Sequence, residues 1–396
     1  MIKRISEKHI KELASMFKVV AVTGPRQSGK TTLVKSVFPD KPYVNLETPV
    51  NRIYATDDPI GFLSQYPDGA ILDEAQNVPH LFSYLQEIVD ENNKPGMFIL
   101  TGSNNFLLNK SISQSLAGRV AYVNLLPFNY PEIKEIIHDY NEQDLMLNGF
   151  YPPVYDQKIP FELWYSNYIR SYIERDVRQI KNINNLVHFE RFIRLLAGYT
   201  GQELNYHALS VEIGIDIKTV QSWIAVLEQS FIVHLLKPYY KNYNKTITKR
   251  PKLYFYDTGI VCSLLGISSK QVLNSHPLKG AIFETFVVSE LIKYKSHVAS
   301  SAGFYYWRDK TGREIDLIIE DENKAVPVEI KSGKTVQDYF FKNIRYWMKL
   351  TGNEKGFLVY TGDISQKRSD GTEAVNWKSI YDFRLSKNSS GVITGI

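Results

Sequence analysis

Residues 24–32 have the composition and spacing of a phosphate-binding loop. They are Gly-Pro-Arg-Gln-Ser-Gly-Lys-Thr-Thr, which fits the pattern G-x-x-x-x-G-K-[ST]. Glycines let the backbone curl, so that successive N–H groups and the start of the following helix point at phosphates. Lys30 can then neutralise the β and γ oxygens of a nucleotide, and the Thr31 hydroxyl can hold Mg²⁺. The expected nucleotide contacts are Gly24, Pro25, Arg26, Gln27, Ser28, Gly29, Lys30, Thr31 and Thr32.

Two adjacent carboxylates follow the apolar stretch 69–72. Asp73 lies where a strand would end and could bind Mg²⁺ through water, while Glu74 could polarise the water that attacks the γ-phosphate. Together with the loop at 24–32, this pair predicts binding and hydrolysis of ATP with Mg²⁺. Two other interpretations remain open. The loop could be a strand-to-helix turn without a ligand, and the carboxylates could be a polar strand end or a helix cap.

Three further residues are candidates for the same chemistry. Ser103 and Asn104 follow the apolar stretch 97–101 and could contact the γ-phosphate from the opposite side, or they could be turn residues. Arg119 follows a glycine at a possible helix end. It could be an arginine finger that stabilises charge on the transferred phosphoryl group, within the subunit or across an interface, or an ordinary surface charge.

These residues can meet only if the elements around them form a parallel sheet. Apolar stretches at 19–22, 43–47, 69–74 and 97–101 alternate with helical patterns, and an amphipathic helix is expected before the first of them. This order predicts an α/β domain with helices on both faces of a parallel sheet. Its ligand would lie at the C-terminal ends of the strands.

Carboxylates and a lysine near the C-terminus form a second candidate site. Residues 279–292 predict an amphipathic helix that carries Glu284, and Asp316 lies near the start of an apolar stretch. Glu329 and Lys331 lie two residues apart, so they share one side of a strand. They could also be no more than a solvated ion pair on a strand face.

The spacing of this second group is similar to the core of PD-(D/E)xK nucleases. That resemblance implies that Asp316 and Glu329 ligate Mg²⁺ and that Glu284 completes the metal shell. It also implies that Lys331 orients the attacking water or stabilises the pentacovalent phosphate. Ile315 stands where the strict motif has proline.

The middle of the chain predicts helices and a possible winged helix. The aromatic face formed by Phe161, Trp164, Tyr168, Tyr172 and Ile173 favours packing against the N-terminal domain. Helices over 206–214 and 218–228, with Gly214 as the C-cap of the first, precede strands at 231–238 and 253–256, which is the winged-helix order. On DNA, the groove would be faced by Lys218, Thr219, Gln221 and Ser222, and the wing would carry Lys241, Lys245, Lys249 and Arg250. Winged helices also dock proteins, so a protein partner is the alternative.

Nearly the whole chain resembles bacterial and archaeal ATPases of the AAA+ superfamily whose C-terminal half carries a domain of unassigned function, DUF4143. The resemblance implies ATP binding and little about biological role. The stretches that carry it are 23–32, 43–47, 58–59, 72–76, 100–103, 116–119, 125–128, 172–177 and 257–259.

Length and composition limit the remaining possibilities. A chain of 396 residues with 43% hydrophobic and 22% charged residues predicts a globular protein of several domains. We expect an ATPase domain at 1–155, a helical and winged-helix domain at 156–275 and a restriction-endonuclease-like α/β domain at 276–396. The net charge of +5 permits a nucleic-acid partner but indicates it only weakly, and DNA is the nucleic acid that the winged-helix and nuclease-like motifs favour.

Cysteine count and hydropathy exclude some classes. The one cysteine, Cys262, excludes an intrachain disulfide and a cysteine-based zinc site. No apolar run has the length of a signal peptide core or a membrane span, so a cytoplasmic protein is expected. Assembly into a homo-oligomer is left open.

The sequence is compatible with two functions. The first is an ATP-dependent enzyme acting on nucleic acid, with a metal-dependent nuclease domain. The second is a nucleotide-controlled switch or scaffold whose nuclease-like domain binds nucleic acid or a protein partner without cleaving. Convergence of Glu284, Asp316, Glu329 and Lys331 around one metal ion distinguishes them.

Overall fold

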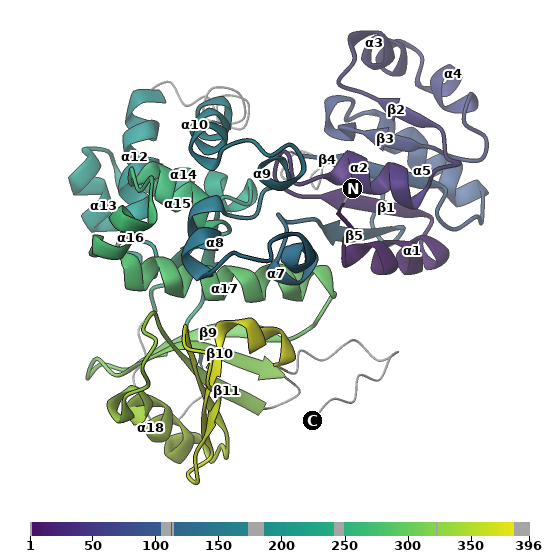
Figure 1. The fold of residues 1–396 in the computed structure, drawn as a ribbon. Coiled ribbons are helices and arrows are strands. Elements are labelled where there is room, and N and C mark those ends of the chain that lie inside the picture. Colours follow the sequence, from purple (N-terminus) through teal and green to yellow (C-terminus); the bar gives the residue numbers. More distant parts are fainter. Residues whose placement is uncertain are drawn as a thin grey trace.

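The computed structural model describes residues 2–103, 112, 115–172, 186–240, 249–321 and 324–383. Figure 1 shows three groups of elements: an N-terminal sheet with its helices, a helical middle part, and a C-terminal sheet. The helix α17 (Lys279–His297) runs between the middle helices and the C-terminal sheet, and its C-terminal end approaches the N-terminal part (Figure 1). Within the described ranges, no helix combines the length and the apolarity needed to cross a membrane.

The N-terminal sheet is parallel throughout, as the sequence predicts. Its five strands lie in the order β2-β3-β4-β1-β5. The sequence did not reveal β5, an edge strand in which buried and exposed residues alternate. The strands are β1 (Val19–Thr23), β2 (Tyr43–Asn45), β3 (Ile71–Asp73), β4 (Phe98–Gly102) and β5 (Val120–Asn124).

Helices cover both faces of this sheet because its central strands are apolar on both sides. Val20 and Val22 of β1 pack with α1 and α2, whereas Val19 and Ala21 pack with α4 and α5. The period of two along a strand places alternate residues on opposite faces. The elements are α1 (Ser6–Met16), α2 (Lys30–Val37), α3 (Pro49–Asp57), α4 (Pro59–Ser64), the 3₁₀ turn η1 (Ala75–Asn77) and α5 (Leu81–Glu91).

The middle part is helical, with a small sheet whose central strand is β8. Both neighbours, β6 and β7, are antiparallel to β8. Gly214 ends α13 with φ +79°, the left-handed conformation expected of a C-cap glycine. The elements are α7 (Tyr130–Ile133), η2 (Lys134–Ile136), α8 (Glu142–Asn148), α9 (Pro152–Asp156), α10 (Phe161–Ser171), α12 (Leu186–Gly198), β6 (Gln202–Glu203), α13 (Tyr206–Ile213), α14 (Ile217–Gln229), β7 (Val233–Leu236), β8 (Lys252–Phe255), α15 (Thr258–Leu264) and α16 (Lys270–Ser275).

The C-terminal sheet is mixed and has the order β13-β14-β12-β11-β10-β9. The strands β9, β10 and β11 pair antiparallel, while β11, β12 and β14 pair parallel. The elements are α17 (Lys279–His297), β9 (Gly303–Arg308), β10 (Glu314–Asp321), β11 (Lys324–Lys331), η4 (Asp338–Phe341), α18 (Lys342–Thr351), β12 (Gly356–Tyr360), β13 (Gln366–Lys367), β14 (Thr372–Asn376) and η5 (Trp377–Asp382).

One hydrophobic core joins the middle and C-terminal parts. It begins at Leu126 and includes buried residues as far as Ile380. Phe286 of α17 belongs to this core, with its ring centre 6.0 Å from that of Phe150 and 5.1 Å from that of Trp377. The expected boundaries after residues 155 and 275 therefore both fall within a continuous core.

Candidate nucleotide-binding site and a second acidic cluster

The loop between β1 and α2 has the conformation that its glycines permit. Gly24 has φ +147°, and a Cβ there would lie 2.1 Å from the carbonyl oxygen of Leu125. Gly29 has φ +92° and directly precedes α2. Residues with a side chain rarely adopt such φ values, so the path of the backbone requires glycine at both positions. Gln27 adopts a positive φ of 60° without being glycine.

Lys30 begins α2 and its side chain folds back over the loop. Its Nζ donates hydrogen bonds to the carbonyl oxygens of Gly24 at 3.0 Å and Pro25 at 2.8 Å. The side chain is therefore held where it can neutralise a phosphate group bound by the same loop.

Asp73, at the end of β3, accepts hydrogen bonds from three hydroxyl groups. Thr31 donates to Oδ2 at 2.9 Å, Tyr43 donates to Oδ2 at 2.6 Å, and Thr101 donates to Oδ1. Burial raises the pKa of Tyr43, and its hydrogen bond to Asp73 raises that pKa further. The oxygens of Asp73 and Thr31 are the kind of donors that Mg²⁺ takes in proteins, so this pair fits the ion.

The sequence did not identify Tyr43 or Thr101. Each lies on a strand next to β3, so the sheet order brings their hydroxyl groups to Asp73. For Thr101, the only indication in the sequence is its hydroxyl group near the end of the apolar stretch 97–101, which follows the strand that ends at Asp73.

Glu74 has the left-handed φ of 54°. Its Oε2 accepts hydrogen bonds from the Ser103 hydroxyl at 3.0 Å and the Ser103 backbone N–H at 3.3 Å. Gln76 donates to the same oxygen at 2.5 Å. The structure thus brings Ser103 to Glu74, while its contact with a γ-phosphate stays a prediction. Asn104 lies outside the described residues.

Arg119 lies at the other end of the sheet. Its carbonyl accepts from the N–H of Val19, at the start of β1, whereas the phosphate-binding loop follows the end of β1. The guanidinium forms a two-pronged pair with Asp90, with distances of 2.5 and 2.7 Å. This placement does not support a finger within the same subunit, and a finger across an interface stays a prediction.

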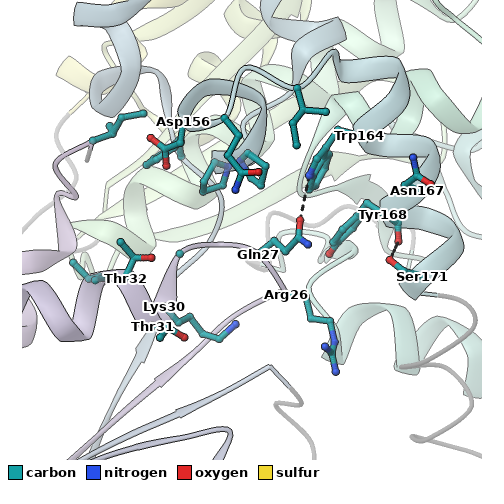
Figure 2. A pocket seen from close by; sticks show the side chains of 18 of the residues that line it. Arg26, Gln27, Lys30, Thr31, Thr32, Asp156, Trp164, Asn167, Tyr168 and Ser171 are labelled. Carbon is teal, nitrogen blue, oxygen red and sulfur yellow. Dashed lines mark hydrogen bonds between the residues drawn. The ribbon is translucent and has the colours of Figure 1, made fainter. Parts of the chain in front are cut away.

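A cavity of about 890 Å³ lies between the loop and the α9–α10 segment. Figure 2 shows Gln27 pointing across it toward Trp164, with Lys30 and Thr31 together on the loop side. The Trp164 Nε1 donates to Gln27 Oε1 at 3.1 Å, and the Trp164 ring stacks on Tyr168 at 4.8 Å. The aromatic face of α10 therefore does contact the N-terminal part.

At the second candidate site, β10 and β11 bring three of the four predicted residues together. The Lys331 Nζ lies 3.2 Å from Asp316 Oδ2 and 2.8 Å from Glu329 Oε2. The N–H of Ile330 also donates to Asp316 Oδ2 at 2.8 Å. Burial, and then the charge of Asp316, raise the pKa of Glu329 well above its usual range. Burial opposes ionisation of Asp316, but the charges of Lys331 and Lys252 outweigh it and lower that pKa.

Glu284, on α17, is paired with two residues of β8, and the charge of Asp316 also acts to raise its pKa. Its Oε1 accepts from Lys252 Nζ at 3.0 Å and from Tyr254 at 2.6 Å, and Lys252 also pairs with Glu314. Burial raises the pKa of Glu284 to about 6, although Lys252 acts to lower it. In the described part of the chain, no group of three His, Cys, Asp or Glu side chains is arranged to hold a metal ion. Metal binding by Glu284, Asp316 and Glu329 stays a prediction, and in this arrangement Lys252 pairs with Glu284.

The fold and the phosphate-binding loop define the N-terminal part as a P-loop domain of the AAA class. Residues 16–134 match the AAA domain family, residues 140–271 match a domain of unknown function, DUF8612, and residues 279–380 match another, DUF4143. These matches confirm the resemblance stated from the sequence for the AAA and DUF4143 regions.

Relatives extend over most of the chain. The uncharacterized protein Rv2008c of Mycobacterium tuberculosis is 32% identical over 321 residues, which cover 80% of this chain and 71% of that protein. The chain therefore belongs to the same family as Rv2008c. The uncharacterized protein MJ1544 of Methanocaldococcus jannaschii is 22% identical over 410 residues, which cover 92% of this chain and 89% of that protein.

Two solved structures align with part of this chain at low sequence identity. The Walker-type ATPase PABY2304 of Pyrococcus abyssi has 14% identity and a TM-score of 0.44, over 67% of this chain and 96% of that one. AMPPCP-bound DnaA from Aquifex aeolicus has 14% identity and a TM-score of 0.30, over 57% of this chain and 86% of that one.

Proposed function

We propose that this protein binds ATP with Mg²⁺ in the cavity between the loop at 24–31 and α10, and that it hydrolyses the ATP. The hydrogen bond from Thr31 to Asp73 carries this proposal, because it joins the start of α2 to the acidic strand in the arrangement that a metal-bound triphosphate requires. Thr31 would hold the ion directly and Asp73 through water. An ion held by these two residues would neutralise charge on the β- and γ-phosphates.

The protein side chains supply the remaining chemistry. Lys30 exchanges its contacts with the Gly24 and Pro25 carbonyls for phosphate oxygens. Glu74, which Ser103 holds in place, accepts a proton from the attacking water. The cavity wall beyond Thr32 includes Ile2, Phe128 and Pro152, so the nucleoside would extend along this apolar surface.

The test is a measurement of nucleotide binding and of phosphate release. Titration calorimetry of the wild type with Mg-ATP should show one site per chain, and phosphate release should require Mg²⁺. Asp73→Asn should keep the fold, because the hydroxyl groups around this position can rotate to accept from the asparagine NH₂ group. The variant should lose the dependence on Mg²⁺ together with most of the hydrolysis. A folded wild type that binds no adenine nucleotide would contradict the proposal.

For the C-terminal part, the contact between Lys252 and Glu284 favours a switch over a nuclease. Lys252, which is 2% exposed, forms an ion pair with the carboxylate of Glu284, the group that would have to bind a metal ion. The residues Asp316, Glu329 and Lys331 keep their places on the two strands without that third ligand. We propose that this region, with nucleotide state as the control, binds nucleic acid or a protein partner without cleaving it.

The helix α14 offers the surface for such a partner. The segment α12 to β8 has the element order and strand pairing of a winged helix. Lys218 and Gln221 of α14 are exposed, whereas the hydroxyl of Thr219 donates to Asp216 at the helix start. Lys241 and Lys245 of the expected wing lie outside the described residues, and Lys249 and Arg250 are exposed.

A cleavage assay distinguishes the two possibilities. Wild-type protein with Mg²⁺ or Mn²⁺ should leave single-stranded, duplex and branched DNA intact. In parallel, fluorescence anisotropy with the same DNA should detect binding that weakens in Lys218→Ala. Cleavage by the wild type that disappears in the double variant Asp316→Asn, Lys331→Ala would establish the nuclease instead.

A further inference from the structure

Arg4 is a buried arginine whose side chain joins three distant segments of the chain. It precedes α1 and is 6% exposed. Its Nε donates to Glu132 Oε1 at 3.0 Å, Nη1 donates to the carbonyl of Ser28 at 2.8 Å, and Nη2 donates to the carbonyl of Leu126 at 2.7 Å. The guanidinium also lies 4.7 Å from the centre of the Phe128 ring. A planar fork fixed in three directions holds its partners in one relative position.

The bond to Ser28 acts on the phosphate-binding loop itself. The peptide between Ser28 and Gly29 is planar and trans, so its carbonyl and its N–H point in opposite directions. With the Ser28 carbonyl held by Arg4, the N–H of Gly29 is directed to the other side of the peptide. Loops of this kind bind phosphate through such N–H groups. Arg4 therefore fixes the orientation of a peptide that a nucleotide would use.

The other side of Arg4 faces the C-terminal end of α17. The Nε2 of His297 lies 3.3 Å from Arg4 Nη2, and its Nδ1 lies 3.1 Å from the side-chain amide of Asn129. His297 is fully buried, and burial lowers its pKa to about 4, so the ring is neutral near pH 7. The neighbouring Ser296 donates to the carbonyl of Asn124, at the end of β5, at 2.9 Å. The last turn of α17 is thus packed against the N-terminal part beside Arg4.

We propose that Arg4 is a positioning residue for the ATP site, and that it makes the phosphate-binding conformation of the Ser28–Gly29 peptide depend on the docking of α17. This inference rests on the proposed ATP-binding function. Because coupling between two sites is reciprocal, nucleotide binding should also strengthen the docking of the last turn of α17. The helix belongs to the DUF4143 region and the loop to the AAA domain, so Arg4 would connect the two.

The first test is Arg4→Lys, which keeps a positive charge near Glu132 but lacks the planar fork. The KM for ATP and the Kd for ADP should rise about tenfold or more, because charge-assisted hydrogen bonds that hold the loop are lost. The kcat should change less than about threefold, because the loop contacts the phosphates alike in the ground state and the transition state. Arg345→Lys is the matched control, since Arg345 pairs with Asp338 and Asp370 on the C-terminal part and should leave KM unchanged.

The second test measures the docking of α17 directly. Hydrogen exchange of the backbone amides at 290–297 should slow in the wild type when ADP or a non-hydrolysable ATP analogue is added, and should not respond in Arg4→Lys. His297→Gln provides a second route from the α17 side and should raise KM in the same direction. It is also the variant to use if Arg4→Lys does not fold.

The outcomes separate the two proposals. If the variants melt at lower temperature but keep wild-type KM and the wild-type response of 290–297, Arg4 is merely structural and the inference fails while the ATP site stands. If the wild type binds no nucleotide, the proposed function fails and the inference fails with it.

Discussion

Thr31 donates a 2.9 Å hydrogen bond to Asp73 across 42 residues of sequence. One residue lies in the first turn of α2 and the other at the end of β3, so the bond measures how closely the sheet brings the loop to the acidic strand. The strand β3, which carries Asp73, and the strand β1, which precedes the loop, are both buried, so the elements that position the two side chains belong to the core of the sheet.

Removal of the loop lysine should abolish nucleotide chemistry. Lys30→Ala deletes the charge that neutralises the phosphates, and phosphate release should fall at least about 100-fold. Lys334→Ala is the matched control, because Ser332-Gly-Lys-Thr335 repeats the end of the motif but has valine where the first glycine should be. Phosphate release by Lys334→Ala should equal that of the wild type. Loss of activity in both variants would mean that the loop at 24–32 has no special role.

Glu74→Gln should separate binding from hydrolysis. Glutamine cannot accept the proton of the attacking water, so kcat should fall about 10²- to 10³-fold. Affinity for ATP should stay within about threefold, because the loop contacts are kept. Glu87→Gln, at an exposed position of α5, is the control. Normal hydrolysis by Glu74→Gln, measured as phosphate release, would show that another group is the base.

Tyr43→Phe should weaken the dependence on Mg²⁺ without removing activity. Asp73 then keeps its bonds from Thr31 and Thr101 but loses the 2.6 Å bond from Tyr43. The Mg²⁺ concentration for half-maximal hydrolysis should rise about tenfold, as is typical when a residue that orients a metal ligand is lost. The control is Tyr54→Phe, which removes a hydroxyl group that accepts a hydrogen bond from Gln65, the residue after α4. It should leave that Mg²⁺ concentration unchanged.

Asp257 should prove important for stability. Its carboxylate is fully buried and accepts from Phe150 N–H at 2.7 Å, Tyr165 hydroxyl at 2.7 Å and Gly259 N–H at 2.9 Å. Asp257→Asn places an NH₂ group against these donors, and the free energy of unfolding should fall by about 3 kcal/mol. Tyr165→Phe, which removes one donor, should cost about 1 kcal/mol. Urea unfolding would measure both, and a smaller loss in Asp257→Asn than in Tyr165→Phe would contradict the expectation.

His297 should make stability fall on acidification. Burial, with help from the charges of Arg4 and Lys293, lowers its pKa from 6.5 to about 4, although Glu132 opposes the shift. Between these values the unfolded chain binds a proton that the folded chain does not, so the contribution is full above pH 6.5 and is lost as the pH falls toward 4. From pH 6.5 to pH 5 this amounts to about 2 kcal/mol. Urea unfolding at pH 7 and pH 5 should show a smaller loss in His297→Gln than in the wild type.

Residues that belong to a local motif can be predicted from the sequence, whereas contacts between residues that are far apart in the sequence cannot. Lys30 and Asp73 could be found because each follows or ends an apolar strand in a recognisable motif. Tyr43 could not, since only the order of the strands places its hydroxyl at Asp73. Glu284 was found as a candidate, but its partner Lys252 comes from a different region of the chain, and no spacing rule relates the two.

The continuous core that includes Phe150, Phe286 and Trp377 also determines where the chain can be cut into fragments that fold. A truncation after residue 275 would remove α17 and leave the aromatic and aliphatic side chains of the preceding helices exposed to water. Such a fragment should aggregate. In the full chain, we expect the C-terminal region to unfold together with the middle region and not before it. The limits of the matched regions at 271 and 279 are therefore not places at which the chain can be cut.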